Sequence, residues 1–185
     1  MGRPKALLVD EEGTPLAGTV VERLRQAGCT SVTVVLGAAA DEAAALLRPY
    51  DVELVVAEEW TTGMGASLRR GLEALPSGAD AALVTLVDLP DVDARVMARV
   101  LEVWRTGGEG DQALLRATYA GRPGHPVLIG RAHWPALVET LEGDVGARGY
   151  LDAHDVVDVP CDDLATGRDV DRPEELDRPV PPDPA

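Results

Sequence analysis

The segment Asp88-Leu89-Pro90 places a carboxylate where a metal ion could bind. It follows an apolar run, residues 81–87 (AALVTLV), with the composition of a buried strand. Ligands of open parallel sheets bind beyond the carboxyl ends of the strands, and one carboxylate together with substrate phosphates is a common arrangement around Mg²⁺. The alternative is an aspartate that caps a helix beginning near Asp91. Position in the sequence leaves both interpretations open.

A second acidic pair, Asp169 and Asp171, precedes a helix that we expect to begin at Pro173. Side chains at i and i+2 of an extended segment point to opposite sides. We therefore expect one of the two acids, and not both, to share a metal ion with Asp88. The competing interpretation is a helix cap before a proline in the first turn.

Lys5 is the single lysine among 17 basic residues. Lysine carries a compact point charge that arginine does not reproduce, so a lysine retained in an arginine-rich chain is a candidate phosphate ligand. An equal alternative is that this one lysine is present by chance. The segment 63–72 adds Gly63 and Gly65 before a predicted helix start, where free backbone N–H groups favour anions. Ser67 and Arg69 supply further donors there, although a tight turn is the simpler explanation.

Two more glycine-containing segments are candidates for ligand contact. Gly124-His125-Pro126 offers an imidazole, although a lone histidine more often fills a polar position in the core. The loop 143–148 carries Asp144 and Arg148 between glycine residues. Neither segment identifies a ligand by itself.

The elements that must position these residues alternate along the chain. Apolar runs rich in branched residues predict strands covered on both faces, and helical spacing of apolar residues falls between them. This order predicts an α/β fold, Rossmann-like and doubly wound, with a mostly parallel sheet and helices on both faces. The expected strands are 31–36, 52–56, 81–87, 113–119 and 126–129, and the expected helices are 18–27, 39–48, 66–75, 94–105 and 132–141.

Length and composition predict a single domain over residues 1–178, followed by a disordered Pro-rich tail, 179–185. The formal net charge of −15 disfavours a nucleic-acid partner. Apolar runs are too short for a membrane span, and the two cysteines form no metal or disulfide pattern. We expect a cytoplasmic protein that acts on small molecules.

Taken together and in order, the motifs resemble those of the molybdenum cofactor cytidylyltransferase family and the wider MobA-like nucleotidyltransferases. Each motif is weak alone, and the specificity comes from their order over residues 1–176. The segments that carry the resemblance are 1–5 (MGRPK) with 13–16 (GTPL), 60–68 (WTTGMGASL), 87–90 (VDLP), 121–128 (GRPGHPVL), 143–148 (GDVGAR) and 169–176 (DVDRPEEL).

This resemblance implies the fold of the nucleotide-diphospho-sugar transferases and a Mg²⁺-dependent enzyme. The implied reaction transfers CMP, or GMP, from an NTP to a phosphorylated acceptor, molybdopterin, and releases pyrophosphate. CTP is preferred over GTP because the downstream motifs look more like the cytidylyl branch. The resemblance also suggests a molybdoenzyme or a maturation protein as a protein partner.

Residue roles follow from the same resemblance. Lys5 is expected to contact the NTP phosphates, and Asp88 with Asp169 or Asp171 to hold Mg²⁺. The nucleotide and acceptor pockets are expected to include Gly63, Gly65, Ser67, Gly124, His125, Asp144 and Arg148.

The sequence also departs from the family pattern. Family members begin with a strand and a glycine-rich phosphate loop ending in Arg-Met-Gly, and here Met1 is the Met of that motif. One expectation is a true start upstream that encodes the strand and loop. The rival is a non-catalytic relative that binds a nucleotide or cofactor on the same scaffold. A dinucleotide-dependent enzyme is disfavoured because no G-x-G-x-x-G follows a strand.

Overall fold

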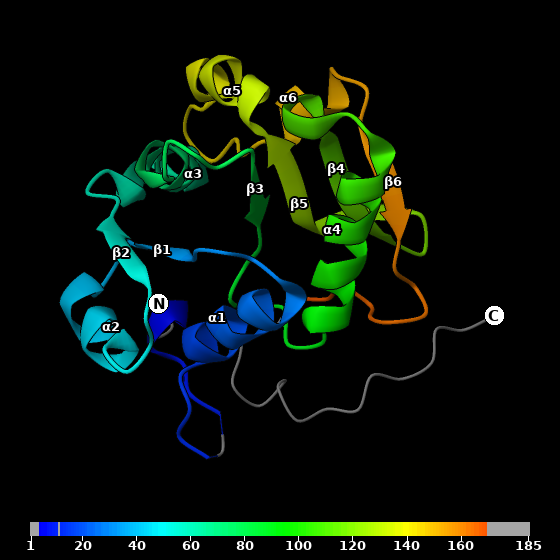
Figure 1. Ribbon diagram of the computed structural model, residues 1–185. Helices are drawn as coiled ribbons and strands as arrows, with labels where there is room; N and C mark the ends of the chain where they lie inside the picture. The colour runs from blue at the N-terminus through cyan, green and yellow to red at the C-terminus, as the bar shows by residue number, and fades with distance from the viewer. Residues whose placement is uncertain (1–3, 11, 170–185) are drawn as a thin grey trace.

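The computed structural model describes residues 4–10 and 12–169. The helix expected from Pro173, the tail 179–185 and Asp171 lie outside the described residues. Helices and strands alternate through most of the chain, and the α/β class is confirmed (Figure 1). No helix in the described ranges has the length and apolar character to cross a membrane. The helices are α1 (Leu16–Ala27), α2 (Ala40–Leu47), α3 (Met64–Ala74), α4 (Ala94–Gly107), α5 (Trp134–Thr140) and α6 (Arg148–Asp152), with short 3₁₀ helices η1 (Lys5–Leu7), η2 (Trp60–Thr62), η3 (Gly110–Gln112) and η4 (Arg131–His133).

The strands of the described residues form two sheets. In the smaller sheet β1 (Thr33–Leu36) pairs in parallel with β2 (Glu53–Val56). The larger sheet has the order β3-β5-β4-β6, where β3 is Ala81–Val84, β4 is Leu114–Tyr119, β5 is Arg122–Gly130 and β6 is Val157–Pro160. Strand β5 runs antiparallel to both of its neighbours, whereas β4 and β6 are parallel. The prediction of a mostly parallel sheet was therefore wrong in this half of the molecule, where the sheet is mixed.

A two-residue turn is the physical reason for the antiparallel pairing of β4 with β5. Tyr119 pairs with Arg122, so Ala120 and Gly121 alone form the connection. Their φ angles are 49° and 70°, and two positive φ angles in a two-residue loop are typical of a type I′ hairpin turn. The expected turn at 121–124 is thus shorter in the structure, and β5 begins at Arg122.

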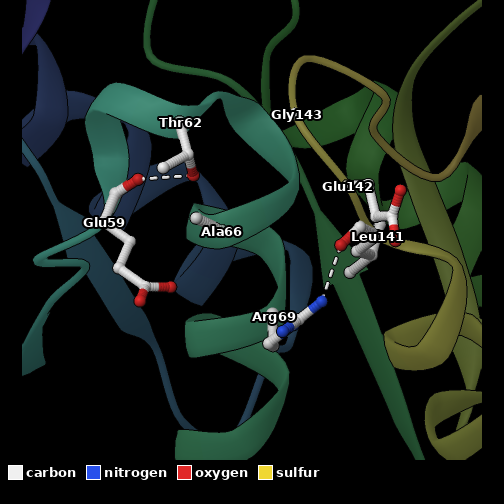
Figure 2. A pocket seen from close by; sticks show the side chains of 7 residues that line it. All are labelled: Glu59, Thr62, Ala66, Arg69, Leu141, Glu142 and Gly143. Carbon is white, nitrogen blue, oxygen red and sulfur yellow. Dashed lines mark hydrogen bonds between the residues drawn. The ribbon is translucent and has the colours of Figure 1, made fainter.

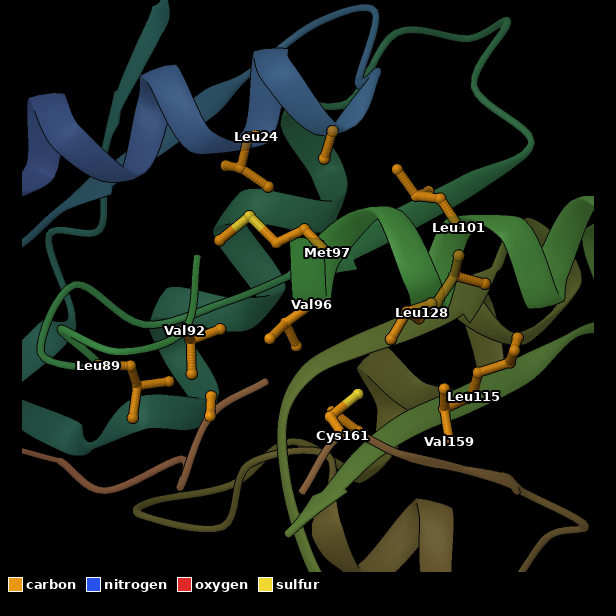
Figure 3. Close-up of a cluster of buried hydrophobic side chains, with 14 of the residues drawn as sticks. Leu24, Leu89, Val92, Val96, Met97, Leu101, Leu115, Leu128, Val159 and Cys161 are labelled. Carbon is orange, nitrogen blue, oxygen red and sulfur yellow. The ribbon is translucent and has the colours of Figure 1, made fainter. Parts of the chain in front are cut away.

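The two faces of β5 pack against different helices because successive side chains of a strand point to opposite sides. Leu128 contacts the cluster on the α1 and α4 side, which Figure 3 shows around Met97. Val127 and Ile129 contact the cluster formed with α3, α5 and α6. Helices cover both faces of the sheet, as expected. A third cluster places α2 and η1 against the smaller sheet.

Three elements differ most from the prediction. Strand β3 ends at Val84 and not at Val87, because its partner β5 leaves regular pairing beyond Val127. Strand β6 and helix α6 were not expected. Strand β6 is four residues long and has one buried residue, Val159, so its hydrophobic pattern is too short to stand out.

The hairpin turn gives a first prediction. We expect Gly121→Ala to lower the free energy of unfolding by about 1 kcal/mol, since a Cβ is costly at positive φ. An added Cβ at Gly121 meets open space, as it does at Gly78, which does not have a positive φ. Gly78→Ala is therefore the matched control and should change stability by less than about 0.5 kcal/mol in urea denaturation. Equal effects of the two variants would contradict the turn assignment.

Candidate active site

A bulge in β5 presents the Gly124-His125-Pro126 segment. Pairing is regular from Ile129 to Val127 and resumes only at Pro123, opposite Thr118, so Ala117 of β4 faces the bulged residues. Gly130 N–H donates to Ala113 O at 2.8 Å, and the alternation of an antiparallel ladder then places Pro126 opposite Ala117. Proline has no N–H to donate there and is tolerated at bulges. The bulge is therefore encoded by Pro126, and it moves His125 out of the ladder.

Asp88 lies in the segment that follows β3, and its carboxylate forms an ion pair with Lys5. Lys5 Nζ is 2.6 Å from Asp88 Oδ2. Asp88 is 8% exposed, and its second oxygen, Oδ1, is buried with no hydrogen-bond partner among the described residues. A buried carboxylate oxygen without a partner is costly. The sequence prediction that brought Lys5 and Asp88 into one site is consistent with this geometry.

The helix-cap interpretation of Asp88 does not hold. Helix α4 begins at Ala94, and the residue that caps it is Asp93, whose carboxylate accepts a hydrogen bond from Arg95 N–H at 2.8 Å. The segment that carries Asp88 is fixed instead by Arg23 of α1. Its guanidinium group donates to Val92 O at 3.1 Å and to Leu89 O at 3.4 Å.

His125 is close enough to Asp88 for the two groups to interact electrostatically. Burial lowers the pKa of His125 below its ordinary value, and the negative charge of Asp88 opposes this shift. The net direction is downward, so the ring is neutral at pH 7. The peptide bond between His125 and Pro126 is cis. A neutral imidazole can donate one hydrogen bond and accept another without adding charge.

The C-terminal part of the described chain approaches the same region. Thr166 donates to Asp91 Oδ2 twice, from its backbone N–H and from Oγ1, both at 2.6 Å. Asp91 belongs to the segment that follows Asp88, so this contact ties the two segments together. Asp169 comes three residues later and is exposed. The structure thus places Asp169 on a chain segment anchored beside the Asp88 segment.

The donor set fits a divalent ion that substrate oxygens help to bind. Within residues 4–10 and 12–169, no group of three or more His, Cys, Asp or Glu side chains is arranged to hold a metal ion. Asp88 offers one carboxylate oxygen that no residue in this part of the chain hydrogen-bonds. Mg²⁺ is commonly held by one or two carboxylates plus substrate phosphates, and these residues are compatible with that arrangement.

The start of α3 differs from the expected anion site. Gly65 N–H donates to Gly143 O at 3.1 Å, so this amide is already used. Gly63 has φ of 129°, and a Cβ there would lie 2.2 Å from the backbone of Gly143. Glycine is required at this position because the loop 143–148 packs directly on the helix start. Both segments are candidates from their glycine patterns, but nothing in the sequence indicates that they contact each other.

Arg69 also has a structural role in place of the expected anion contact. Its Nη2 donates to Leu141 O at 2.6 Å and to Val138 O at 3.3 Å, the carbonyls at the end of α5. Arg148 lies 4.0 Å from Asp152 in its own helix, and Asp144 is exposed. Figure 2 shows the pocket beside Arg69, with a volume of about 280 Å³, lined by Glu59, Thr62, Ala66, Arg69, Leu141, Glu142 and Gly143.

Sequence reasoning missed the residues that hold the site segments in place. Arg23 and Thr166 act through contacts between residues more than 60 positions apart, and no local pattern indicates such contacts. The sequence pattern predicts only that Tyr119 belongs to a strand. A signal was available for Asp93, because an aspartate immediately before a helical pattern is typical of a cap.

Comparison with known proteins gives a family match over most of the chain. The model described as the MobA-like NTP transferase domain matches residues 1–159. The chain is 37% identical over 187 aligned residues to a protein named nicotine blue oxidoreductase from Paenarthrobacter nicotinovorans, with 96% of this chain and 89% of the relative covered. The matching family model is named for a transferase, whereas this relative is named as an oxidoreductase.

Solved structures agree on the fold. Rv0371c of Mycobacterium tuberculosis H37Rv, in a complex with manganese, is 29% identical with a TM-score of 0.72, and the match covers 86% of this chain and 83% of that one. The molybdopterin-guanine dinucleotide biosynthesis protein A of Archaeoglobus fulgidus is 17% identical with a TM-score of 0.67, covering 95% of this chain and 88% of that one. At that identity the second match shows the fold alone.

His125 gives a second prediction. Because its folded-state pKa is lowered, its contribution to stability is complete above the unfolded value of about 6.5 and is lost as the pH falls through the folded-state pKa. We expect its ring signals in NMR to titrate below 6.5, with assignment by their loss in His125→Gln. The same variant should remove part of the acid-side loss of stability. A titration midpoint at or above 6.5 would contradict the buried, neutral ring.

The contact between Gly63 and Gly143 gives a third prediction. We expect Gly63→Ala to lower the free energy of unfolding by about 2–4 kcal/mol, since it combines backbone strain with a clash against main-chain atoms. Gly146→Ala, in the same loop but with open space for a Cβ, is the control and should change stability by less than about 0.5 kcal/mol. Chemical denaturation measures both, and a tolerated Gly63→Ala would mean that the loop does not pack on α3.

Proposed function

Because the chain belongs to the MobA-like NTP transferase family, we propose that it transfers a nucleotidyl group from an NTP to molybdopterin and releases pyrophosphate. CTP is the proposed donor in preference to GTP, and the proposed location is the cytoplasm. The observation that carries the proposal is Asp88, a buried carboxylate beside the ammonium group of Lys5, one of whose oxygens has no hydrogen-bond partner within the described ranges. A carboxylate for a divalent ion and a cation for phosphate are the groups that such transfer needs.

In the proposed reaction a phosphate oxygen of the acceptor attacks the α-phosphorus of the NTP, and the bond to the β-phosphate breaks. The protein supplies position and charge rather than a covalent nucleophile. Mg²⁺, held by Asp88 and by Asp169 or Asp171, would neutralise charge on the phosphates. Lys5 is 37% exposed, so its ammonium group can turn from Asp88 to a phosphate oxygen when substrate enters.

His125 would contact the acceptor close to Asp88. Its neutral ring adds no positive charge and can hydrogen-bond to a polar group. The bulge holds it outside the ladder, where it interacts electrostatically with Asp88. Gly124 and His125 are thus proposed to line the acceptor pocket.

A second candidate function is a redox reaction. It is favoured by the 37% identity to a protein named as an oxidoreductase over almost the whole chain. No dinucleotide-binding glycine pattern follows a strand in the sequence. A further alternative is a relative that binds nucleotide without turnover. Oxidation of NADH or NADPH in the presence of nicotine blue, followed at 340 nm beside pyrophosphate release, separates these functions.

Asp88 gives the fourth prediction. We expect Asp88→Asn to reduce pyrophosphate release from CTP or GTP with molybdopterin by about a hundredfold or more, because asparagine is a far poorer ligand for a hard cation. Binding of Mn²⁺, measured by titration, should weaken in parallel. The thermal midpoint measures whether the fold survives.

The control is Lys5→Met, which removes the ion pair but leaves the carboxylate. If Asp88 binds the metal, Lys5→Met should retain Mn²⁺ binding and lose affinity for the nucleotide. If Asp88 acts only as a partner of Lys5, the two variants should behave alike. A folded Asp88→Asn protein with normal turnover and Mn²⁺ binding would overturn the assignment.

A further inference from the structure

Tyr119 connects two segments of the candidate site. It is the last residue of β4 and is 7% exposed. Its hydroxyl donates a hydrogen bond to His125 O at 2.6 Å, which satisfies a carbonyl that the bulge removes from regular pairing. Burial raises the pKa of Tyr119, so the hydroxyl remains protonated and remains a donor at physiological pH.

The ring of Tyr119 packs against two glycines. A Cβ at Gly124 would lie 2.8 Å from the ring, and a Cβ at Gly167 would lie 2.3 Å from it. Gly167 also has φ of 65°, a conformation that favours glycine. One glycine precedes His125 and the other lies two residues before Asp169. The same side chain therefore contacts the bulge and the segment that leads to the candidate metal ligands.

The segment before Asp169 is held at further points near Tyr119. Cys161 N–H donates to Thr118 O at 2.9 Å, and Thr166 donates to Asp91 Oδ2. Gly167 follows directly and rests on the ring. These contacts fix the path of the chain up to Gly167. The position of the Tyr119 ring therefore influences where the chain places Asp169, two residues later.

We infer that Tyr119 is a positioning residue, which sets His125 through its hydroxyl and sets the Asp169 segment through its ring. This inference rests on the proposed function, which assigns acceptor contact to His125 and metal binding to the Asp169 segment. The alternative is that Tyr119 only fills the core. A phenylalanine would then serve as well as a tyrosine, and its hydroxyl would not affect His125.

The two halves of Tyr119 can be separated by substitution. Tyr119→Phe keeps the ring and removes the hydroxyl. We expect the NMR ring signals of His125 to shift in this variant, because its carbonyl loses its partner, while the dissociation constant for Mn²⁺ stays within about twofold of the wild-type value. The thermal midpoint should show that the protein remains folded.

Gly167→Ala tests the ring contact. The new methyl group displaces the ring, so we expect both the His125 signals and Mn²⁺ binding to change, with affinity falling about tenfold. Tyr50→Phe, at a tyrosine packed against Gly18 in another part of the fold, is the control and should change neither.

Three outcomes would decide against the inference. His125 signals that are unchanged in Tyr119→Phe would show that the hydroxyl has no positioning role. Unchanged His125 signals or unchanged Mn²⁺ affinity in Gly167→Ala would show that the ring does not couple the segments. If the wild-type protein itself bound no Mn²⁺ and released no pyrophosphate, the proposed function would fail, but the His125 signals would still test the role of Tyr119.

Discussion

Pro126 has no backbone N–H, and it stands at the one position of β5 where the ladder with β4 calls for a donor toward Ala117. The chain bulges there, and this bulge determines much of the candidate site. It takes His125 out of regular pairing and leaves the His125 carbonyl for Tyr119. It also ends the pairing of β5 with β3 at Val84, which releases the residues before Asp88 from the sheet. The missing N–H of Pro126 thus accounts for why the candidate site residues lie outside the regular sheet.

The net charge of this protein does not describe the charge around the candidate site. A formal charge of −15 repels phosphate at long range, yet Lys5 lies beside the buried carboxylate of Asp88. Many exposed acids pair with arginines away from this site. Arg99, for example, lies 2.5 Å from Asp163 and lowers the pKa of that carboxyl to about 2. Such neighbours neutralise surface charge in place, so the local field around Lys5 can differ in sign from the field of the whole chain.

The sequence predicted most helices and the α/β class, because apolar spacing reports directly on which side of an element is buried. Helix α4 shows this well, with Val96 and Val100 buried as expected and Gly108 at its end in the left-handed conformation. The antiparallel direction of β4 and β5 was not predictable. It depends on a two-residue turn, whereas the sequence pattern predicts a longer turn at 121–124. The partners of Gly63 and Arg69 were also hidden, because they lie more than 65 positions away in the chain. Residue types made Asp88 and Lys5 candidates, and the structure shows that Asp93, and not Asp88, caps α4.

The contacts at the start of α3 restrict how the nearby pocket could admit a ligand. Gly65 is bonded to Gly143, and Arg69 holds the carbonyls at the end of α5. The loop beyond Leu141 is therefore attached to α3 at two levels, one turn of helix apart. Lifting this loop away from α3 would break the Gly65–Gly143 hydrogen bond and both hydrogen bonds of Arg69. Because Arg69 joins α3 to the end of α5, a sliding of the two helices would break its bonds as well. Either motion belongs to the microsecond to millisecond class.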